Sequence, residues 1–221
     1  MSAEPTLTAR PEDGLDIPLL VWRFAEPLLA ISSAALGGGI GIRHWVVNAT
    51  VPMSYRRDDP DVHLAELAAR EGLAGPGIGL LTGVDVAEVV TADDGGVRAW
   101  ATVGLGQPIW ASAPPVAAPA GPGTVNIVVR VPVRLSVAAL VNAVATATEA
   151  KAQALWELGL PATGTSTDAI SVLCAAEGPE AEYGGPRSEW GAPLARAVHA
   201  AVRTGGGTGQ GSGMPWSERL R

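Results

Sequence analysis

The sequence has 221 residues and a net charge of −7, and 47% of its residues are hydrophobic. This length and apolar content suit one domain with a sizeable core. Proteins that bind nucleic acids or anionic membranes usually carry basic patches, so the negative net charge argues against both as partners. The single cysteine, Cys174, excludes an internal disulfide and a metal site with several cysteine ligands, and it is compatible with the reducing cytoplasm.

The two ends of the chain differ from its middle. Residues 1–15 contain acids and prolines but no apolar stretch, which predicts a flexible leader rather than a signal peptide. Residues 205–221 predict a Gly/Ser-rich tail, so the domain is expected over residues 16–204. Within it, residues 111–123 are rich in Ala and Pro and predict a long surface loop. Prolines interrupt this uncharged region, so we expect no membrane helix there.

Strands dominate the first half of the chain. β-Branched and aromatic residues between turn signals predict strands, and Asp93–Gly96 has the composition of a hairpin turn. The predicted strands are Ile17–Phe24, Leu28–Ser33, His44–Val51, Val86–Ala92, Val97–Leu105, Thr124–Val133 and Ala169–Ala175.

Three helices are predicted, mostly in the second half. Asp59 and Pro60 predict the start of one that ends near Gly72, and Ser136 predicts the cap of a long one that ends near Leu158. A third follows from helical spacing of apolar residues between 194 and 202. Strands dominate the first half of the chain, and strands alternate with helices in the second half. This order favours an α+β fold, in which helices pack on a mostly antiparallel or mixed sheet within a single domain. A three-layer α/β arrangement is the alternative.

A glycine-rich segment is the first candidate site. Gly37, Gly38 and Gly39 precede His44 and Trp45, so backbone N–H groups, an imidazole and an indole lie within a short span. The spacing fits neither a Walker motif nor a dinucleotide fingerprint. A simple turn between strands explains the glycines equally well.

Polar residues at helical spacing form a second candidate. Asn142, Thr146, Glu149 and Gln153 are expected on one face of the long helix. A solvated helix face is the favoured interpretation, and the wall of a wet pocket is the alternative.

A third candidate is the polar segment Thr163–Ala169, which leads into an apolar strand. Asp168 could act as a general base there if burial raised its pKa, although Ser, Thr and Asp also satisfy their own local backbone. In the strand before it, Asn126 alternates with apolar residues and is expected to face the opposite side of the sheet, where it needs partners or lines a site.

The histidines do not predict a metal site. His63 and His199 share predicted helix faces with charged residues and are expected to be solvated. With three scattered histidines and one cysteine, we expect no zinc site, and Cys174 is expected to be buried and inert.

Seven motifs occur in an order that resembles one family. They are Ser32–Gly39, Val47–Pro52, Gly79–Val84, Val103–Gly106, Gly123–Ile127, Thr148–Lys151 and Ala162–Ala169. Together they resemble the adenosylcobinamide amidohydrolase (CbiZ) family over about residues 17–203. The resemblance implies a hydrolase of corrinoid salvage that cuts the amide between the aminopropanol arm and the corrin ring of adenosylcobinamide, giving adenosylcobyric acid. It implies no cofactor from the protein, because the cobalt belongs to the corrinoid substrate.

This implied reaction assigns roles to the candidate residues. We expect water attack with Asp168 or Glu149 as general base, and a covalent route through Ser32, Thr124 or Thr165 is the alternative. Backbone N–H groups of the glycine segment or of the Gly164–Thr165 turn are expected to hold the oxyanion. Trp45, Trp100 and Trp110 are possible stacking surfaces. The expected substrate contacts are Gly37, Gly38, Gly39, His44, Trp45, Thr82, Thr124, Asn126, Asn142 and Thr167.

Other functions stay open at this point. A non-catalytic corrinoid carrier or sensor would have the same pocket. A phosphate or nucleotide binder is disfavoured because no lysine follows the glycines. The sequence permits a homodimer and a monomer equally, and it leaves open which corrinoid is preferred.

Overall fold

A computed structural model describes residues 4–12, 14–114, 123–207 and 214–219. Eight of its strands form one mixed sheet in the order β4-β3-β2-β9-β7-β6-β5, with β1 paired to β2, so the predicted α+β fold is confirmed. The strands of this sheet are β1 (Thr6–Glu12), β2 (Leu15–Ser32), β3 (Gly39–Thr50), β4 (Gly77–Thr82), β5 (Val90–Asp94), β6 (Val97–Leu105), β7 (Gly123–Arg130) and β9 (Ala169–Ala175). The helices are α1 (Pro60–Arg70), α2 (Val137–Glu157) and α3 (Gly191–Gly207), with the short turns η1 (Val86–Glu88) and η2 (Trp216–Glu218) and a small sheet of β8 (Arg134–Leu135) and β10 (Glu180–Ala181).

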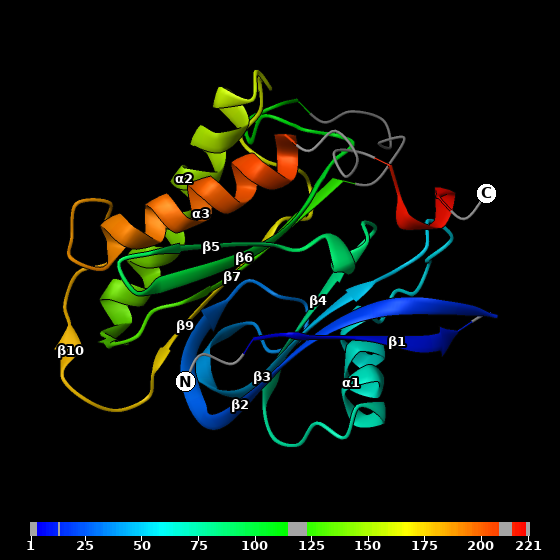
Figure 1. The fold of residues 1–221 in the computed structure, drawn as a ribbon, viewed down its shortest axis with the longest axis horizontal. Coiled ribbons are helices and arrows are strands. Elements are labelled where there is room, and N and C mark those ends of the chain that lie inside the picture. Colours follow the sequence, from blue (N-terminus) through cyan, green and yellow to red (C-terminus); the bar gives the residue numbers. More distant parts are fainter. Residues whose placement is uncertain (1–3, 13, 115–122, 208–213, 220–221) are drawn as a thin grey trace.

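The large sheet curls so that its two halves face each other, with helices outside each half (Figure 1). One apolar cluster packs α2 and α3 against the outer face of β5, β6, β7 and β9. A second packs α1 against the outer face of the other half. The third lies between the two halves and includes Trp22 and Trp100, whose rings meet edge to face at 5.8 Å. Trp100 is therefore a core residue, and its expected role as a stacking surface is wrong.

β2 makes the curl possible because it belongs to both halves. Two strands were expected here, Ile17–Phe24 and Leu28–Ser33, and the structure joins them into one strand of 18 residues. The pairing with β3 shifts register between Arg23 and Leu28, and only the second part of β2 also pairs with β9. The intervening residues, which include Pro27, form a bulge rather than a turn, and bulges bend strands and increase their twist.

A buried side-chain network closes the curl. Asn126 of β7 donates hydrogen bonds to the Asn48 side chain of β3 and to the Leu81 carbonyl of β4, each 2.9 Å long. Asn48 in turn donates to the Thr102 hydroxyl of β6 at 3.0 Å. The three side chains are 2% exposed. β3 and β7 are not neighbours in the sheet, so this network joins strands that share no backbone ladder, and Asn126 faces away from its apolar neighbours as predicted.

The helix predictions hold with one correction. The Ser136 hydroxyl accepts a hydrogen bond from the Ala139 N–H at 3.1 Å and caps α2, as predicted. α1 begins at Pro60 as predicted, but the Asp59 side chain makes no capping hydrogen bond. Asp59 instead pairs with Arg57 at 2.8 Å. None of the described helices is both long and apolar enough to cross a bilayer.

The expected leader and tail contain ordered elements. Thr6–Glu12 forms β1, and each of its residues pairs with a residue of β2. At the other end, α3 continues to Gly207. Trp216 of η2 is buried, and its backbone N–H donates to the Gly83 carbonyl at 2.9 Å. The flexible character expected of residues 1–15 is therefore wrong for β1. Most of the expected surface loop, residues 115–122, lies outside the described residues.

Two strand predictions also need correction. β4 was not predicted, because glycines at alternate positions weaken its strand pattern. The side chains of Trp45 and Leu64 occupy the space where a Cβ of residue 77 or 79 would stand, which explains Gly77 and Gly79. The strand predicted over Val86–Ala92 begins only at Val90, because Val86–Glu88 form the turn η1.

His63 was expected to be solvated, and this is wrong. Its side chain is 2% exposed because it shares the inner face of α1 with Leu64 and Leu67. Its Nδ1 lies 3.1 Å from the Tyr55 hydroxyl, and its Nε2 lies 3.4 Å from Glu12 Oε1. Burial lowers the pKa of His63 below its ordinary value of 6.5, and the nearby Glu12 only partly opposes this effect.

The lowered pKa of His63 predicts a loss of stability in acid. As pH falls below 6.5, the imidazole of the unfolded chain binds a proton, whereas the buried imidazole of the folded chain binds one only at lower pH. Proton binding therefore favours the unfolded chain in this range. The free energy of unfolding, measured with urea, should therefore fall less steeply below pH 6.5 in His63→Gln than in the wild type. His199→Gln is the control, because that ring is partly exposed. Equal slopes in all three proteins would contradict the prediction.

The network of Asn126 predicts a large cost for its removal. Asn126→Ala leaves the Leu81 carbonyl and the Asn48 side-chain oxygen without this donor in the interior, so we expect a loss of about 2–4 kcal/mol in unfolding free energy. Asn142→Ala, on the exposed face of α2, should change it by less than about 0.5 kcal/mol. Similar losses for both variants, in urea melts, would show that the network does not close the sheet.

Candidate functional site

The carboxylate of Asp168 is the centre of a cluster at the start of β9. Its Oδ1 accepts hydrogen bonds from the Val125 N–H at 2.8 Å and from the Thr165 hydroxyl. Its Oδ2 accepts from the Thr165 N–H at 3.0 Å and from the Lys151 ammonium. Four donors thus converge on one carboxylate and fix it relative to β7, α2 and the loop before β9.

Lys151 reaches Asp168 from inside the fold. The two side chains are only 7% and 9% exposed, so the ion pair is largely removed from water. A buried charge needs both a counter-charge and hydrogen bonds, and the pair supplies both. The loop makes room for it at Gly164, where a Cβ would collide with Asp168 Oδ2 and stand 2.6 Å from Lys151 Nζ.

Lys151 was not among the predicted site residues. It lies four residues after Ala147 and three before Ala154, both of which are fully buried. A lone lysine on the alanine face of a helix is the signal that could have identified it, because such a charge must find a buried partner. Glu149 lies two positions earlier and is exposed, so the helix turns it away from Asp168.

Two threonine hydroxyls extend the cluster towards the surface. The Thr167 hydroxyl donates to the Gly123 carbonyl at 2.9 Å, and the Thr124 and Thr167 hydroxyls are 2.6 Å apart. Because Thr167 uses its proton on the carbonyl, Thr124 must donate to Thr167. The lone pairs of Thr124 therefore remain available to a donor such as a substrate amide.

Ser32, the last residue of β2, and Ser33, just after it, lie beside β9. Ser32 is buried, its hydroxyl lies 2.8 Å from that of Ser171, and it also accepts from the Ala34 N–H. Ser33, which was not among the predicted residues, is exposed and accepts from the Ile170 N–H at 3.1 Å. Ser33 is thus the more accessible of the two hydroxyls.

Thr82 and Asn126 lie at the inner edge of the cluster. Asn126 and Val125 are adjacent in β7, so the closing network and the Asp168 carboxylate meet on this strand. Thr82 is buried, and its hydroxyl accepts from the Val84 N–H at 3.3 Å. The cluster is therefore attached to β7 directly and, through Asn126, to β4.

The glycine segment follows Ser32 and Ser33, with Gly39 opposite Ser32 in the pairing of β2 and β3, and its Gly37 lies beside α1. Gly37 and Trp45 line a groove of about 460 Å³ with alanines of α1, and the Trp45 indole donates to the Gly75 carbonyl at 3.1 Å. Gly37 approaches β4 so closely that a Cβ would collide with the Gly77 carbonyl oxygen. The carbonyls of Gly37 and Gly38 accept from Arg43. The structure thus places Gly37 and Trp45 together on the α1 side of the sheet, whereas His44, next to Trp45 in β3, points to the opposite face. Asn142, like Glu149, is exposed on α2.

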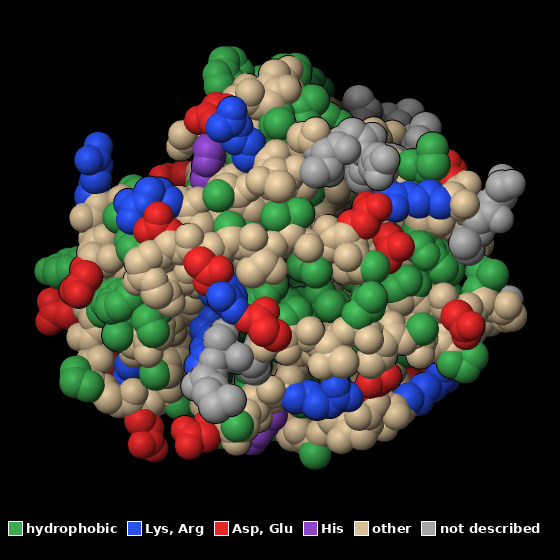
Figure 2. All heavy atoms as spheres, in the orientation of Figure 1, with side chains coloured by type: hydrophobic (Ala, Val, Ile, Leu, Met, Phe, Trp, Pro, Cys, Tyr) green, Lys and Arg blue, Asp and Glu red, His purple; other side chains and the backbone are tan. Residues whose placement is uncertain are grey.

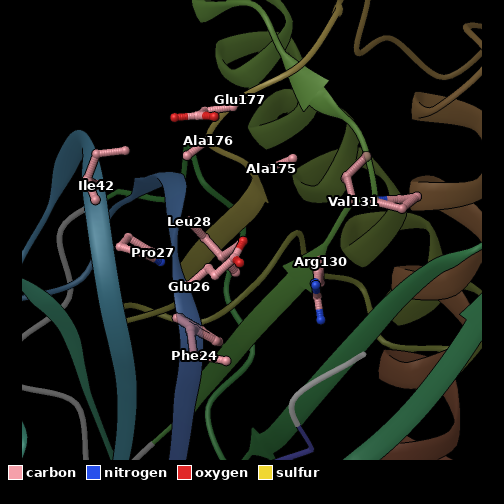
Figure 3. A pocket seen from close by; sticks show the side chains of 12 residues that line it. Phe24, Glu26, Pro27, Leu28, Ile42, Arg130, Val131, Ala175, Ala176 and Glu177 are labelled. Carbon is pink, nitrogen blue, oxygen red and sulfur yellow. The ribbon is translucent and has the colours of Figure 1, made fainter.

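A larger cavity of about 930 Å³ lies at the opposite end of β7 and β9 (Figure 3). The bulge of β2 forms one wall, with Glu26 and Phe24, and the ends of β7 and β9 form the other, with Arg130 and Glu177. None of the motif residues around Asp168 lines it. We assign the candidate site to the Asp168 cluster, because buried polar groups converge there.

The donors near Asp168 do not form a metal site. Among the described residues, no group of three or more His, Cys, Asp and Glu side chains lies close enough to hold a metal ion. Cys174 is buried, as predicted, and burial raises the pKa of its thiol.

Comparison with known proteins identifies the family. A sequence model described as adenosylcobinamide amidohydrolase matches residues 4–212. A protein named adenosylcobinamide amidohydrolase from Methanosarcina mazei is 32% identical over 182 residues, which cover 78% of this chain and 88% of the relative. One of the same name from Halobacterium salinarum is 35% identical over 194 residues, covering 83% and 82%. The chain belongs to the adenosylcobinamide amidohydrolase family.

Proposed function

We propose that this protein hydrolyses the amide between the aminopropanol arm and the corrin ring of adenosylcobinamide, giving adenosylcobyric acid for cobalamin salvage. The names of its family and relatives support the substrate and the reaction. The observation that carries the assignment of the site is the contact of the Thr165 hydroxyl with the fixed Asp168 carboxylate. A hydroxyl held against a carboxylate is the arrangement that activates a nucleophile.

In the proposed reaction, a water molecule bound to Thr165 attacks the amide carbon. The water passes one proton to the Thr165 oxygen while the Thr165 proton moves to Asp168 Oδ1. When the C–N bond breaks, the proton held by Asp168 passes to the leaving amine, so that a carboxylic acid and an amino alcohol are formed. Asp168 suits this role better than Glu149, because its Oδ1 contacts the Thr165 hydroxyl, whereas Glu149 is exposed on α2.

The negative charge that develops on the amide oxygen needs donors nearby. Among the described residues, the backbone N–H groups of Ser166 and Thr167 donate to no protein acceptor, and both residues are exposed beside Asp168. The Thr165 N–H already donates to Asp168 and is less suited to this task. We therefore assign the oxyanion to the N–H groups of Ser166 and Thr167.

The remaining assignments follow the same chemistry. We propose that the protein supplies no metal ion or cofactor of its own and that the cobalt enters with the substrate. We also propose a cytoplasmic location and no nucleic-acid partner. Acidic and basic side chains are interspersed on the face seen in Figure 2 and do not gather there into a basic field. A homodimer and a monomer both remain compatible with this proposal.

Substitutions at Asp168 and Glu149 separate the two carboxylates. Asp168→Asn should lower kcat by about 100-fold or more, because the Thr165 hydroxyl loses its proton acceptor. Glu149→Gln should keep the wild-type rate. Release of aminopropanol measures the rate. Asp168→Asn also leaves Lys151 without its counter-charge, so circular dichroism melts must show that the variant folds. A wild-type rate for Asp168→Asn, with a large loss in Glu149→Gln, would transfer the role to Glu149.

Thr165→Val tests the hydroxyl without changing any charge. The isosteric variant should lose at least about 100-fold in kcat, and Thr165→Ser should retain most of the rate. Mass spectrometry of the protein during turnover distinguishes water attack from the covalent route, in which Thr165 would carry the corrinoid acyl group. Tight binding of adenosylcobinamide with unchanged mass in the wild type would instead support the carrier or sensor.

A further inference from the structure

Two exposed tryptophans lie together beside the Asp168 cluster. Trp110 and Trp156 are 42% and 65% exposed, with ring centroids 6.2 Å apart and planes inclined at 52°. Figure 2 shows hydrophobic side chains at the surface over the end of α2, the helix that carries Trp156. Single exposed apolar residues are ordinary, but two paired indoles next to a candidate site indicate a contact surface.

The pair is attached to the loop that holds Asp168. The Ile109 N–H donates to the Gly164 carbonyl at 2.8 Å, and the Ile109 carbonyl accepts from the Thr163 N–H at 2.9 Å. On the other side of Trp110, the Ala111 N–H donates to the Thr163 hydroxyl at 2.9 Å. The backbone on both sides of Trp110 is thus bonded to the residues just before Thr165.

Trp156 is anchored independently of that loop. It lies five residues after Lys151 on α2, so the helix that supplies the cluster's ammonium also supplies the second indole. Its ring points to solvent while Lys151 points to Asp168, since five residues turn a helix by about 140°. Because Trp156 is largely exposed, its ring is accessible to a ligand.

We propose that the Trp110–Trp156 pair binds the purine of the substrate's adenosyl group by stacking, while the amide arm reaches Thr165. The proposal rests on the proposed function. A purine is flat on both sides and stacks on an indole regardless of hydrogen-bond pattern. A corrin ring is a poorer match, because axial ligands and ring substituents project from its faces. The pair is therefore a specificity-determining contact for the adenosylated substrate and not a catalytic one.

The test compares adenosylcobinamide with cobinamide that carries hydroxide in place of the adenosyl group. In Trp156→Ala, Kd and KM for the adenosylated form should rise by about 5- to 150-fold with little change in kcat, and the hydroxide form should bind as it does to the wild type. Trp156→Phe should recover most of the affinity, because phenylalanine keeps a stacking face. Isothermal titration measures Kd, and Tyr183→Ala, at a residue 71% exposed, is the control for removing a surface ring.

Three outcomes would overturn the proposal. The first is unchanged affinity for the adenosylated form in Trp156→Ala. The second is an equal loss for both corrinoids, which would place the corrin ring on the indoles. The third is a change from dimer to monomer by light scattering without a ligand-specific effect, which would make the pair a contact between copies. Because Kd is measured without turnover, a wild type that binds but does not cut would refute the proposed function and leave this test intact.

Discussion

The buried carboxylate of Asp168 is the constraint on which the candidate site depends. A carboxylate and an ammonium that are almost fully removed from water are stable only when both find partners. That requirement fixes the Thr165 backbone and hydroxyl, the Val125 amide and the side chain of Lys151. It also explains the glycine at 164, since a Cβ there would occupy the space of the ion pair. The result is a carboxylate held by a helix, a strand and the loop before β9, and such rigid support is what a catalytic group needs.

The curled sheet supplies the second part of the site. Its bulged strand β2 turns one half of the sheet towards the other, and Asn126 then bonds to strands that are not its ladder neighbours. The same strand, β7, carries Thr124 and Val125 towards Asp168. The hydrogen bonds of Asn126 and the contacts to Asp168 thus belong to the same strand, so the position of the Thr124 hydroxyl depends on the closure of the sheet.

Local patterns predicted much of the fold and less of the site. The cap at Ser136, the hairpin at Asp93–Gly96 and the helical spacing of α3 depend on neighbours in sequence, and the structure confirms them. β4 and the continuity of β2 depend on pairing between distant segments, which no local pattern shows. The local pattern could indicate that Lys151 and His63 face the interior, but their partners, Asp168 and Glu12, lie on other elements and only the fold identifies them. The order of the motifs indicated the family. Only the fold shows that the groove beside α1 and the Asp168 cluster are different places on the protein.

The most direct test of the Asp168 site is a crystal structure of Thr165→Val with adenosylcobinamide bound. We expect the amide carbon of the aminopropanol arm next to position 165, separated from the substituted side chain by the space of one water molecule and beside the N–H groups of Ser166 and Thr167. A corrinoid bound instead in the 930 Å³ cavity between Glu26 and Arg130, at the far end of β7 and β9, would contradict this assignment.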